Sequence, residues 1–290
     1  MRRESPWGAC LRYAALLLLA TPLADAADMV RVPAGETRIG SDQGGRPDEG
    51  PSFLAQVAAF DLDRTPVTVA AYAGYVERTG YRSEAERLGS GAVMSFGTGL
   101  WSLVEGADWR RPLGPKGAAA APDHPVTQVS WNDAVAYCAA AGKRLPTEIE
   151  YEHASRAGQA AARAHAFGDQ LVENGRYRAN IWTGVFPLLN TGKDGYKTTS
   201  PVGAFGSGPL GLVDMAGNVW EWTDDWYRPY RERLQPWPAG KAGEKVQRGG
   251  SFLCDPGICY GFRVTARGHA TPDSSHMHVG FRCARSVKPT

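Results

Sequence analysis

Glycine and proline set the strongest limit on what this chain can fold into. The 290 residues include 35 glycines and 20 prolines, so few stretches are long enough for extended regular structure. Both residues favour turns, because glycine tolerates positive φ angles and proline lacks a backbone N–H. The sequence therefore predicts a loop-rich fold in which helices and strands are short.

The rest of the composition is that of an ordinary folded chain. Charged residues make up 21% and aromatic residues 10%, and the formal net charge is +2 with both signs interspersed. So small a charge does not indicate nucleic acid as a partner. A chain of this length can bury a sizeable core.

Residues 1–26 have the pattern of a secretory signal peptide. Basic residues flank a short apolar run at 14–20, and Ala24-Asp25-Ala26 has the small residues of a cleavage site. The run is shorter than the ~20 residues that a membrane-spanning helix needs. We therefore expect a mature domain of residues 27–290 that is exported, either periplasmic or secreted, in a compartment that permits disulfides.

Three segments of the mature part have the periodicity of helices. Thr68, Ser130 and Thr147 are suitable N-caps, apolar residues follow at helical spacing, and a glycine ends each segment. A short strand followed by a turn is expected at 28–35, a second short strand at 37–41 and a strand at 55–63. Residues 81–128 are aperiodic and predict a long ordered loop. Because no repeat or linker divides the mature chain, we expect a single α+β domain with little regular secondary structure.

Cysteines are scarce, and two of them lie close together near the C-terminus. Cys254 and Cys259 follow a Gly-Gly-Ser turn at 249–251, with four residues between them. Such a pair in an exported protein suits a structural disulfide. It equally suits Cu(I), a soft ion that accepts two thiolate ligands. The spacing is wide for a zinc site and no suitably spaced histidine pair follows, but the residues alone do not choose between disulfide and copper.

Two polar clusters contain the oxygen ligands that calcium prefers. Asn180 and Asp194 belong to the first cluster, and Asn218 and Glu221 lie three residues apart in the second. Asx-turns and helix caps use the same residue types. The spacing alone therefore leaves both interpretations open.

Several motifs, taken in order, resemble the family of sulfatase-modifying factors and formylglycine-generating enzymes. They are Pro-Val-Thr-Gln-Val-Ser-Trp-Asn-Asp-Ala at 125–134, Gly-Lys-Arg-Leu-Pro-Thr-Glu at 142–148, Met-Ala-Gly-Asn-Val-Trp-Glu-Trp at 215–222, Arg-Gly-Gly-Ser-Phe at 248–252 and Gly-Phe-Arg at 280–282. The resemblance runs from about Met29 to Arg285. It implies the fold of that family, which is related to C-type lectin-like folds.

The same resemblance implies the residues of the site. Gly-Gly-Ser-x-x-Cys-x4-Cys is the pattern of the catalytic members, so Cys254 and Cys259 are expected to bind Cu(I), with Ser251 and Trp222 lining their pocket. The other two cysteines of the mature part, Cys138 and Cys283, are expected to form a disulfide. The calcium ligands expected by resemblance are Asn180, Ile181, Asp194 and Tyr196 for one ion, and Asn218 and Glu221 for another.

The implied function is an oxidation of peptidyl-cysteine, a post-translational modification. The expected substrate is an unfolded sulfatase with a Cys-x-Pro-x-Arg segment, whose cysteine is converted by dioxygen to Cα-formylglycine. We expect the oxidoreductase to act as a monomer, without nucleic acid and without a membrane span. The alternative is a non-catalytic ligand-binding or accessory maturation protein of the cell envelope, in which the two active cysteines form an inert disulfide.

Three positions near the expected peptide cleft depart from the family pattern. Asp255 stands where the family often has histidine, Ile258 where it often has tyrosine, and His278 where it often has asparagine. These departures bear on the substrate motif and the rate more than on the fold.

Overall fold

The structure is a computed structural model that describes residues 28–287, except residues 44, 159–162 and 239. The predicted signal peptide at 1–26 and the first mature residue, Ala27, lie outside the described residues. Within the described ranges, none of the helices has the length and apolar character of a membrane span.

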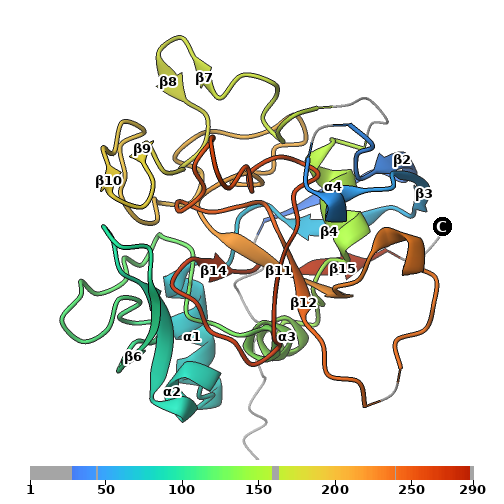
Figure 1. Cartoon of the computed structure of the whole chain (residues 1–290). Coiled ribbons are helices and arrows are strands. Elements are labelled where there is room, and N and C mark those ends of the chain that lie inside the picture. Colours follow the sequence, from blue (N-terminus) through green and yellow to red (C-terminus); the bar gives the residue numbers. More distant parts are fainter. Residues whose placement is uncertain (1–27, 44, 159–162, 239, 288–290) are drawn as a thin grey trace, which may run out of the picture.

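Two small sheets form the centre of the molecule (Figure 1). The first is antiparallel, and its strands in order are β1 (Met29–Val32), β4 (Phe60–Asp63) and β15 (Ala284–Ser286). The second has the order β13 (Gly268–Ala270), β12 (Lys245–Arg248), β11 (Trp220–Trp226) and β14 (Val279–Gly280). In the second sheet β11 and β14 run parallel, and the other neighbours are antiparallel.

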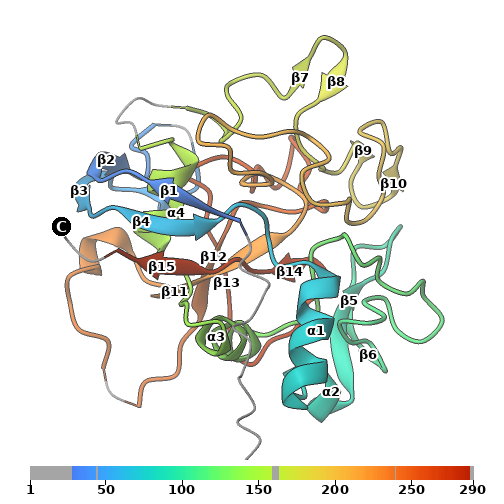
Figure 2. The ribbon, with the colours of Figure 1, turned by 180° about the vertical axis from the view of Figure 1, so that it is seen from behind.

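Four hairpins surround the sheets (Figure 2). They are β2 (Gly35–Ile39) with β3 (Phe53–Val57), β5 (Ser90–Met94) with β6 (Trp101–Glu105), β7 (Val172–Glu173) with β8 (Arg176–Tyr177), and β9 (Gly184–Val185) with β10 (Leu189–Asn190). Two single 3-10 turns, η1 (Pro47–Glu49) and η2 (Tyr230–Glu232), complete the regular structure of the described residues. The low regular content predicted from glycine and proline is confirmed.

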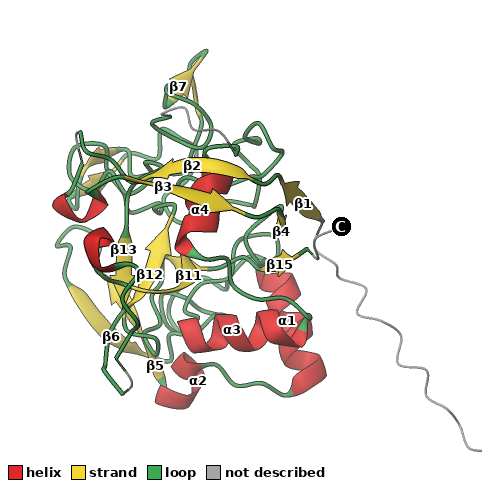
Figure 3. Cartoon of the chain, turned by 90° about the vertical axis from the view of Figure 1, so that its right-hand side faces the viewer, coloured by secondary structure: helices red, strands yellow, loops and turns green. Residues whose placement is uncertain are grey.

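The three predicted helices are present as α1 (Val69–Thr79), α3 (Trp131–Ala140) and α4 (Glu148–Ser155). Thr68, Ser130 and Thr147 cap them, each accepting a hydrogen bond from a backbone N–H three residues further on. Figure 3 shows α1 and α3 close together below the strands, whereas α4 lies against β2 and β3.

Two of the predicted elements are wrong in detail. Residues 81–128 are not one loop, because they contain the helix α2 (Glu84–Leu88) and the hairpin β5–β6. Residues 55–63 are not one strand: β3 ends at Val57 and β4 begins at Phe60, and the two belong to different sheets. In both regions elements of only four or five residues are too short for periodicity to show them.

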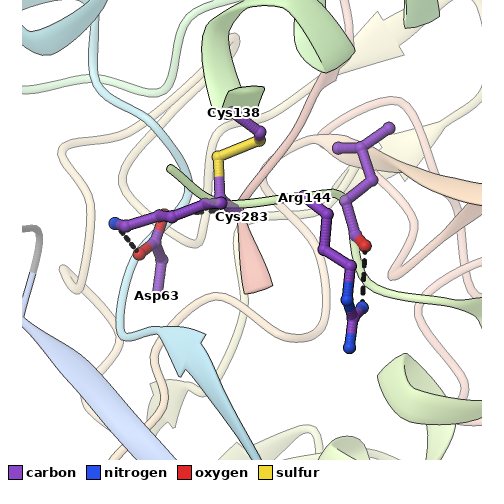
Figure 4. Close-up of a disulfide and its surroundings, with 6 residues drawn as sticks. Asp63, Cys138, Arg144 and Cys283 are labelled. Atoms are coloured by element: carbon purple, nitrogen blue, oxygen red, sulfur yellow. Dashed lines mark hydrogen bonds and ion pairs between the residues drawn. A yellow bond between two sulfur atoms is a disulfide. The ribbon is translucent and has the colours of Figure 1, made fainter. Parts of the chain in front are cut away.

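A disulfide between Cys138 of α3 and Cys283 fastens the C-terminal strand to a helix (Figure 4). Both residues are fully buried. The carboxylate of Asp63 lies beside the bridge, where it accepts the Cys283 N–H at 3.0 Å and the Lys143 ammonium at 2.6 Å. The bridge and this ion pair together hold α3, β4 and β15 in one place.

We predict that the Cys138→Ala/Cys283→Ala variant is much less stable to urea than the parent chain. The bridge joins residues 145 apart in sequence, and the entropy of closing such a loop corresponds to at most about 5 kcal/mol in the free energy of unfolding. Equilibrium unfolding followed by tryptophan fluorescence measures the change. The matched control is Cys254→Ala/Cys259→Ala, which removes two cysteines but no disulfide of the structure. Equal midpoints for the two double variants would contradict a stabilising bridge.

Candidate active site

Cys254 and Cys259 lie side by side as free thiols in the segment between β12 and β13. Their Sγ atoms are 2.7 Å apart. One turn of chain brings them together, because the carbonyl of Asp255 accepts the N–H of Cys259 at 3.1 Å. Cys254 is buried and Cys259 is partly exposed. One cysteine of the pair is therefore enclosed, and the other is a partly exposed residue.

Ser251 belongs to the same turn and holds Cys254 in place. Its backbone N–H donates to the Cys254 Sγ at 3.4 Å, and its hydroxyl accepts the N–H of Leu253 at 3.2 Å. The carbonyl of Cys254 in turn accepts the N–H of Trp182 at 3.0 Å. The enclosed thiol is thus anchored through its side chain and its backbone.

The structure places Trp220, rather than Trp222, against the thiols. A Cβ added to Gly261 would lie 2.5 Å from the Trp220 ring and 2.7 Å from the Cys254 Sγ, so ring and sulfur meet across this glycine. Trp222 is fully buried, and its indole N–H donates to the carbonyl of Val129 at 3.0 Å. The two tryptophans lie two positions apart on β11, so the motif alone did not distinguish them.

The two thiols have opposite pKa shifts. Burial, together with donation of its proton to the neighbouring sulfur, raises the pKa of Cys254 well above its ordinary value. The hydrogen bond from Cys254 lowers the pKa of Cys259 to about 7, and the Gly261 N–H and the Arg46 charge act in the same direction. Near neutral pH the pair therefore shares one proton, with Cys259 as the more acidic member.

Two arginines, Arg248 and Arg263, lie at the two ends of the cysteine segment, and carboxylates hold both. The Arg248 guanidinium donates to carboxylates of Glu148 and Glu152 on α4, and Arg263 forms an ion pair with Glu49. These ion pairs fix the two ends of the cysteine segment in position. The charges of the two arginines are taken up by carboxylates rather than by the thiols.

The first expected calcium cluster is brought together. The Asp194 carboxylate accepts the N–H of Ile181 at 2.9 Å and that of Tyr196 at 3.1 Å. Asn180 is buried, and its amide nitrogen donates to the carbonyl of Thr198 at 2.8 Å. The Asn180 Oδ1 is buried without a hydrogen-bond partner. A buried amide oxygen left unsatisfied, on the residue before one that donates to the Asp194 carboxylate, is what a bound cation would complete.

The second expected calcium pair is Asn218 and Glu221. In the structure the side-chain oxygens of both residues already have protein partners. Both carboxylate oxygens of Glu221 accept from the Arg282 guanidinium, at 2.6 and 2.8 Å, and the pair is fully buried. The Asn218 Oδ1 accepts from the Ser200 N–H and from the Asn180 side chain. The charge of Glu221 is thus already neutralised by a protein partner.

This combination of fold and site matches a known class of domain. The family model for the sulfatase-modifying factor enzyme 1-like domain matches residues 17–287. The formylglycine-generating enzyme of Streptomyces coelicolor is 44% identical over 283 residues, which cover 90% of each chain. The chain belongs to the sulfatase-modifying factor family.

Two further similarities show how broad that family is. The inactive C-alpha-formylglycine-generating enzyme 2 of Bos taurus is 38% identical, covering 89% of this chain and 87% of that one. The structure of PvdO from Pseudomonas aeruginosa superposes with a TM-score of 0.68 at 27% identity, covering 89% and 94% of the two chains. Because the family includes a member named as inactive, membership alone does not indicate activity, and the thiol pair is the feature that does.

We predict that Cys259 reacts with iodoacetamide at a rate that rises through a midpoint near pH 7, because the reactive thiolate forms there. The Cys254→Ala variant loses the hydrogen bond that contributes most to the low pKa, so its midpoint shifts upward toward that of an ordinary thiol. Alkylation of the reduced, metal-free chain, followed by mass spectrometry across the pH range, measures both profiles. In Cys259→Ala the buried Cys254 reacts slowly at every pH tested. Identical profiles for parent and Cys254→Ala would contradict a shared proton.

Proposed function

We propose that the chain converts a cysteine of a sulfatase polypeptide to formylglycine, with a Cu(I) ion held by Cys254 and Cys259. The observation that carries the proposal is the pair of adjacent free thiols, one buried and one accessible. The similarity to enzymes named for formylglycine formation supplies the reaction.

The donor set fits Cu(I) better than zinc. Two sulfurs are soft ligands, and the described part of the chain contains no group of three or more His, Cys, Asp or Glu side chains suited to a metal. Structural zinc takes four protein ligands and catalytic zinc three. A pair of thiolates without a third protein ligand therefore favours an ion of low coordination number.

The residues around the thiol pair hold the two cysteines in place and orient their sulfurs. Bound copper would supply the activation of dioxygen, which accepts the two electrons removed from the substrate cysteine and is reduced to hydrogen peroxide. Water supplies the oxygen of the aldehyde, and the sulfur leaves as hydrogen sulfide. Ser251 and the Trp182 N–H fix Cys254, while Cys259 faces the accessible side. The buried ring of Trp220 lies against the Cys254 sulfur and keeps water away from it.

An exposed apolar face supports an unfolded polypeptide as the substrate. The hairpins β5–β6 and β9–β10 meet where the Gly97 N–H donates to the Pro187 carbonyl at 2.8 Å, and Figures 1 and 2 show them side by side. Large apolar side chains are exposed on both: Phe96, Leu100, Trp101, Leu103, Val185, Leu188 and Leu189. Phe96 and Phe186 also pack on Trp182, whose backbone N–H donates to the Cys254 carbonyl. Apolar side chains of an unfolded chain are suited to such a face.

Export of the enzyme is part of the same proposal. The signal-peptide pattern at 1–26 predicts it, and a disulfide such as Cys138–Cys283 persists in oxidising compartments. A sulfatase that has just crossed a membrane is unfolded, so its cysteine is accessible in that compartment before the sulfatase folds.

We predict that the mature chain, loaded with Cu(I) and supplied with air, converts the cysteine of a Cys-x-Pro-x-Arg peptide to an aldehyde. Mass spectrometry and capture by a hydrazide probe detect the product. Cys254→Ser and Cys259→Ser each abolish the conversion because either change removes a thiolate ligand. The matched control, Cys138→Ser/Cys283→Ser, removes two cysteines away from the site and retains turnover wherever it remains folded.

The outcome that would overturn the proposal is equally specific. If no aldehyde forms and the two thiols are recovered as a Cys254–Cys259 disulfide that resists mild reductant, the chain is a non-catalytic binding or accessory protein of this fold. The departures at Asp255 and Ile258 affect the choice of peptide, so the assay includes peptides varied on both sides of the cysteine.

We further propose that Ca²⁺ binds at Asn180, Ile181, Asp194 and Tyr196 as a structural ion. The unpartnered Asn180 Oδ1 and the adjacent Asp194 carboxylate support this site. Burial raises the pKa of Asp194, and a bound cation would offset that cost. The proposal is confined to this cluster because Glu221 of the other is paired with Arg282.

We predict that EGTA lowers the melting temperature of the chain and that added Ca²⁺ restores it. Asp194→Asn removes the charged ligand, so Ca²⁺ no longer raises the melting temperature of this variant. Asp273→Asn, a change at an exposed aspartate of a turn, keeps the full response. Differential scanning fluorimetry with and without Ca²⁺ measures the shifts. An unchanged response in Asp194→Asn would place the ion elsewhere.

A further inference from the structure

A turn just before β14 places two imidazole rings beside an exposed tryptophan. The Val279 N–H donates to the His276 carbonyl at 3.3 Å, which closes the turn. Met277 points inward, is 1% exposed and accepts the Met94 N–H on its sulfur. The rings of His276 and His278 have their centres 5.9 Å apart, and that of Trp101 lies 5.7 Å from the first and 5.0 Å from the second.

Each of these histidines has a buried ring nitrogen without a partner. The Nδ1 atoms of His276 and His278 are both inaccessible to solvent and make no hydrogen bond. Buried polar atoms in proteins are nearly always satisfied, so two adjacent exceptions call for an explanation such as an ion. Burial also lowers the pKa of both rings, that of His278 to about 3, and neutral imidazole is the form that ligates metals.

We propose that His276 and His278 form a second metal site, which takes Cu(I) on two imidazole nitrogens. A nitrogen–metal bond is about 2.0–2.1 Å long. With a nitrogen–metal bond of that length, two imidazole rings on one ion have centres no more than about 6.5 Å apart. The observed 5.9 Å lies within that limit. With no third His, Cys, Asp or Glu ligand grouped there in the described residues, a two-coordinate ion fits and zinc does not.

Trp101 completes the site as a lid on a monovalent cation. Its indole lies within 6 Å of both imidazole rings, so an ion that the rings hold would lie beside an aromatic ring. Trp101 is 45% exposed, so this side of the cluster is at the surface.

The second site lies next to the thiol pair. The Trp220 N–H donates to the His278 carbonyl at 2.9 Å, and the Trp220 ring lies against the Cys254 sulfur. Trp220 thus contacts the histidine turn through its backbone and the Cys254 sulfur through its ring. Transfer of Cu(I) from the histidines to the thiol pair would rest on the proposed function. Binding of Cu(I) at the histidines does not rest on it.

The test titrates the Cys254→Ser/Cys259→Ser chain with Cu(I) under anaerobic conditions, in competition with a chromophoric Cu(I) chelator. We expect one Cu(I) per chain, and X-ray absorption should show nitrogen neighbours without sulfur. Adding His276→Gln/His278→Gln abolishes the binding. His124→Gln/His269→Gln, changes at two histidines outside the cluster, leaves it unchanged.

A second measurement keeps the result interpretable where the cysteine variant does not fold. The parent chain then binds two Cu(I) ions and its His276→Gln/His278→Gln variant binds one. Equal stoichiometry in these two proteins, or retention of Cu(I) by the histidine variant in the cysteine-free background, would overturn the second site. Neither readout requires oxidase activity, so failure of the proposed function and failure of this site are separate outcomes.

Discussion

The arrangement of the site depends on the buried guanidinium of Arg248. One of its nitrogens donates to Glu152 and to the carbonyl of Val264, both at 2.6 Å, and the other donates to Glu148 at 3.1 Å. Arg248 ends β12 and Val264 follows the cysteine segment, so a single side chain ties both ends of that segment to α4. Such a buried ion pair gains little net stability after desolvation, but removing one partner leaves an uncompensated charge. Its contribution is therefore the geometry of the segment it encloses.

Within that frame the backbone packs too closely for side chains at two glycines. A Cβ on Gly250 would lie 2.5 Å from the Gly261 backbone, and both residues flank the thiol pair in space. Gly250 also has φ of 73°, a conformation that L-residues with side chains adopt rarely. The turn before the cysteines and the turn after them thus press against each other. This contact, together with the Arg248 clamp, explains why residues five apart in sequence hold their sulfurs in contact without a bond.

The sequence predicted what depends on local chemistry and missed what depends on pairing. Caps at Thr68, Ser130 and Thr147 gave three helices, because each cap bonds only to its own first turn. The helix α2 has the same capping box, at Ser83 and Glu86, but its five residues show no periodicity. The cysteine spacing left a disulfide and a copper site open, and the family resemblance indicated a working pair. The choice between Trp220 and Trp222 required the register of β11, in which Trp220 lies opposite Val279, and no local pattern encodes that register.

The shared proton of the thiol pair indicates which charge the site accepts. Cys254 keeps its proton because burial penalises a thiolate, and it donates that proton toward Cys259, whose pKa falls to about 7. The pair then carries one negative charge. A monovalent ion between two thiolates leaves the same single negative charge, so proton and ion exchange without changing the charge of a buried site. A divalent ion would change that charge, with no further protein carboxylate or thiol grouped there in the described residues to complete its coordination. Charge balance and donor number thus favour the same monovalent, soft ion.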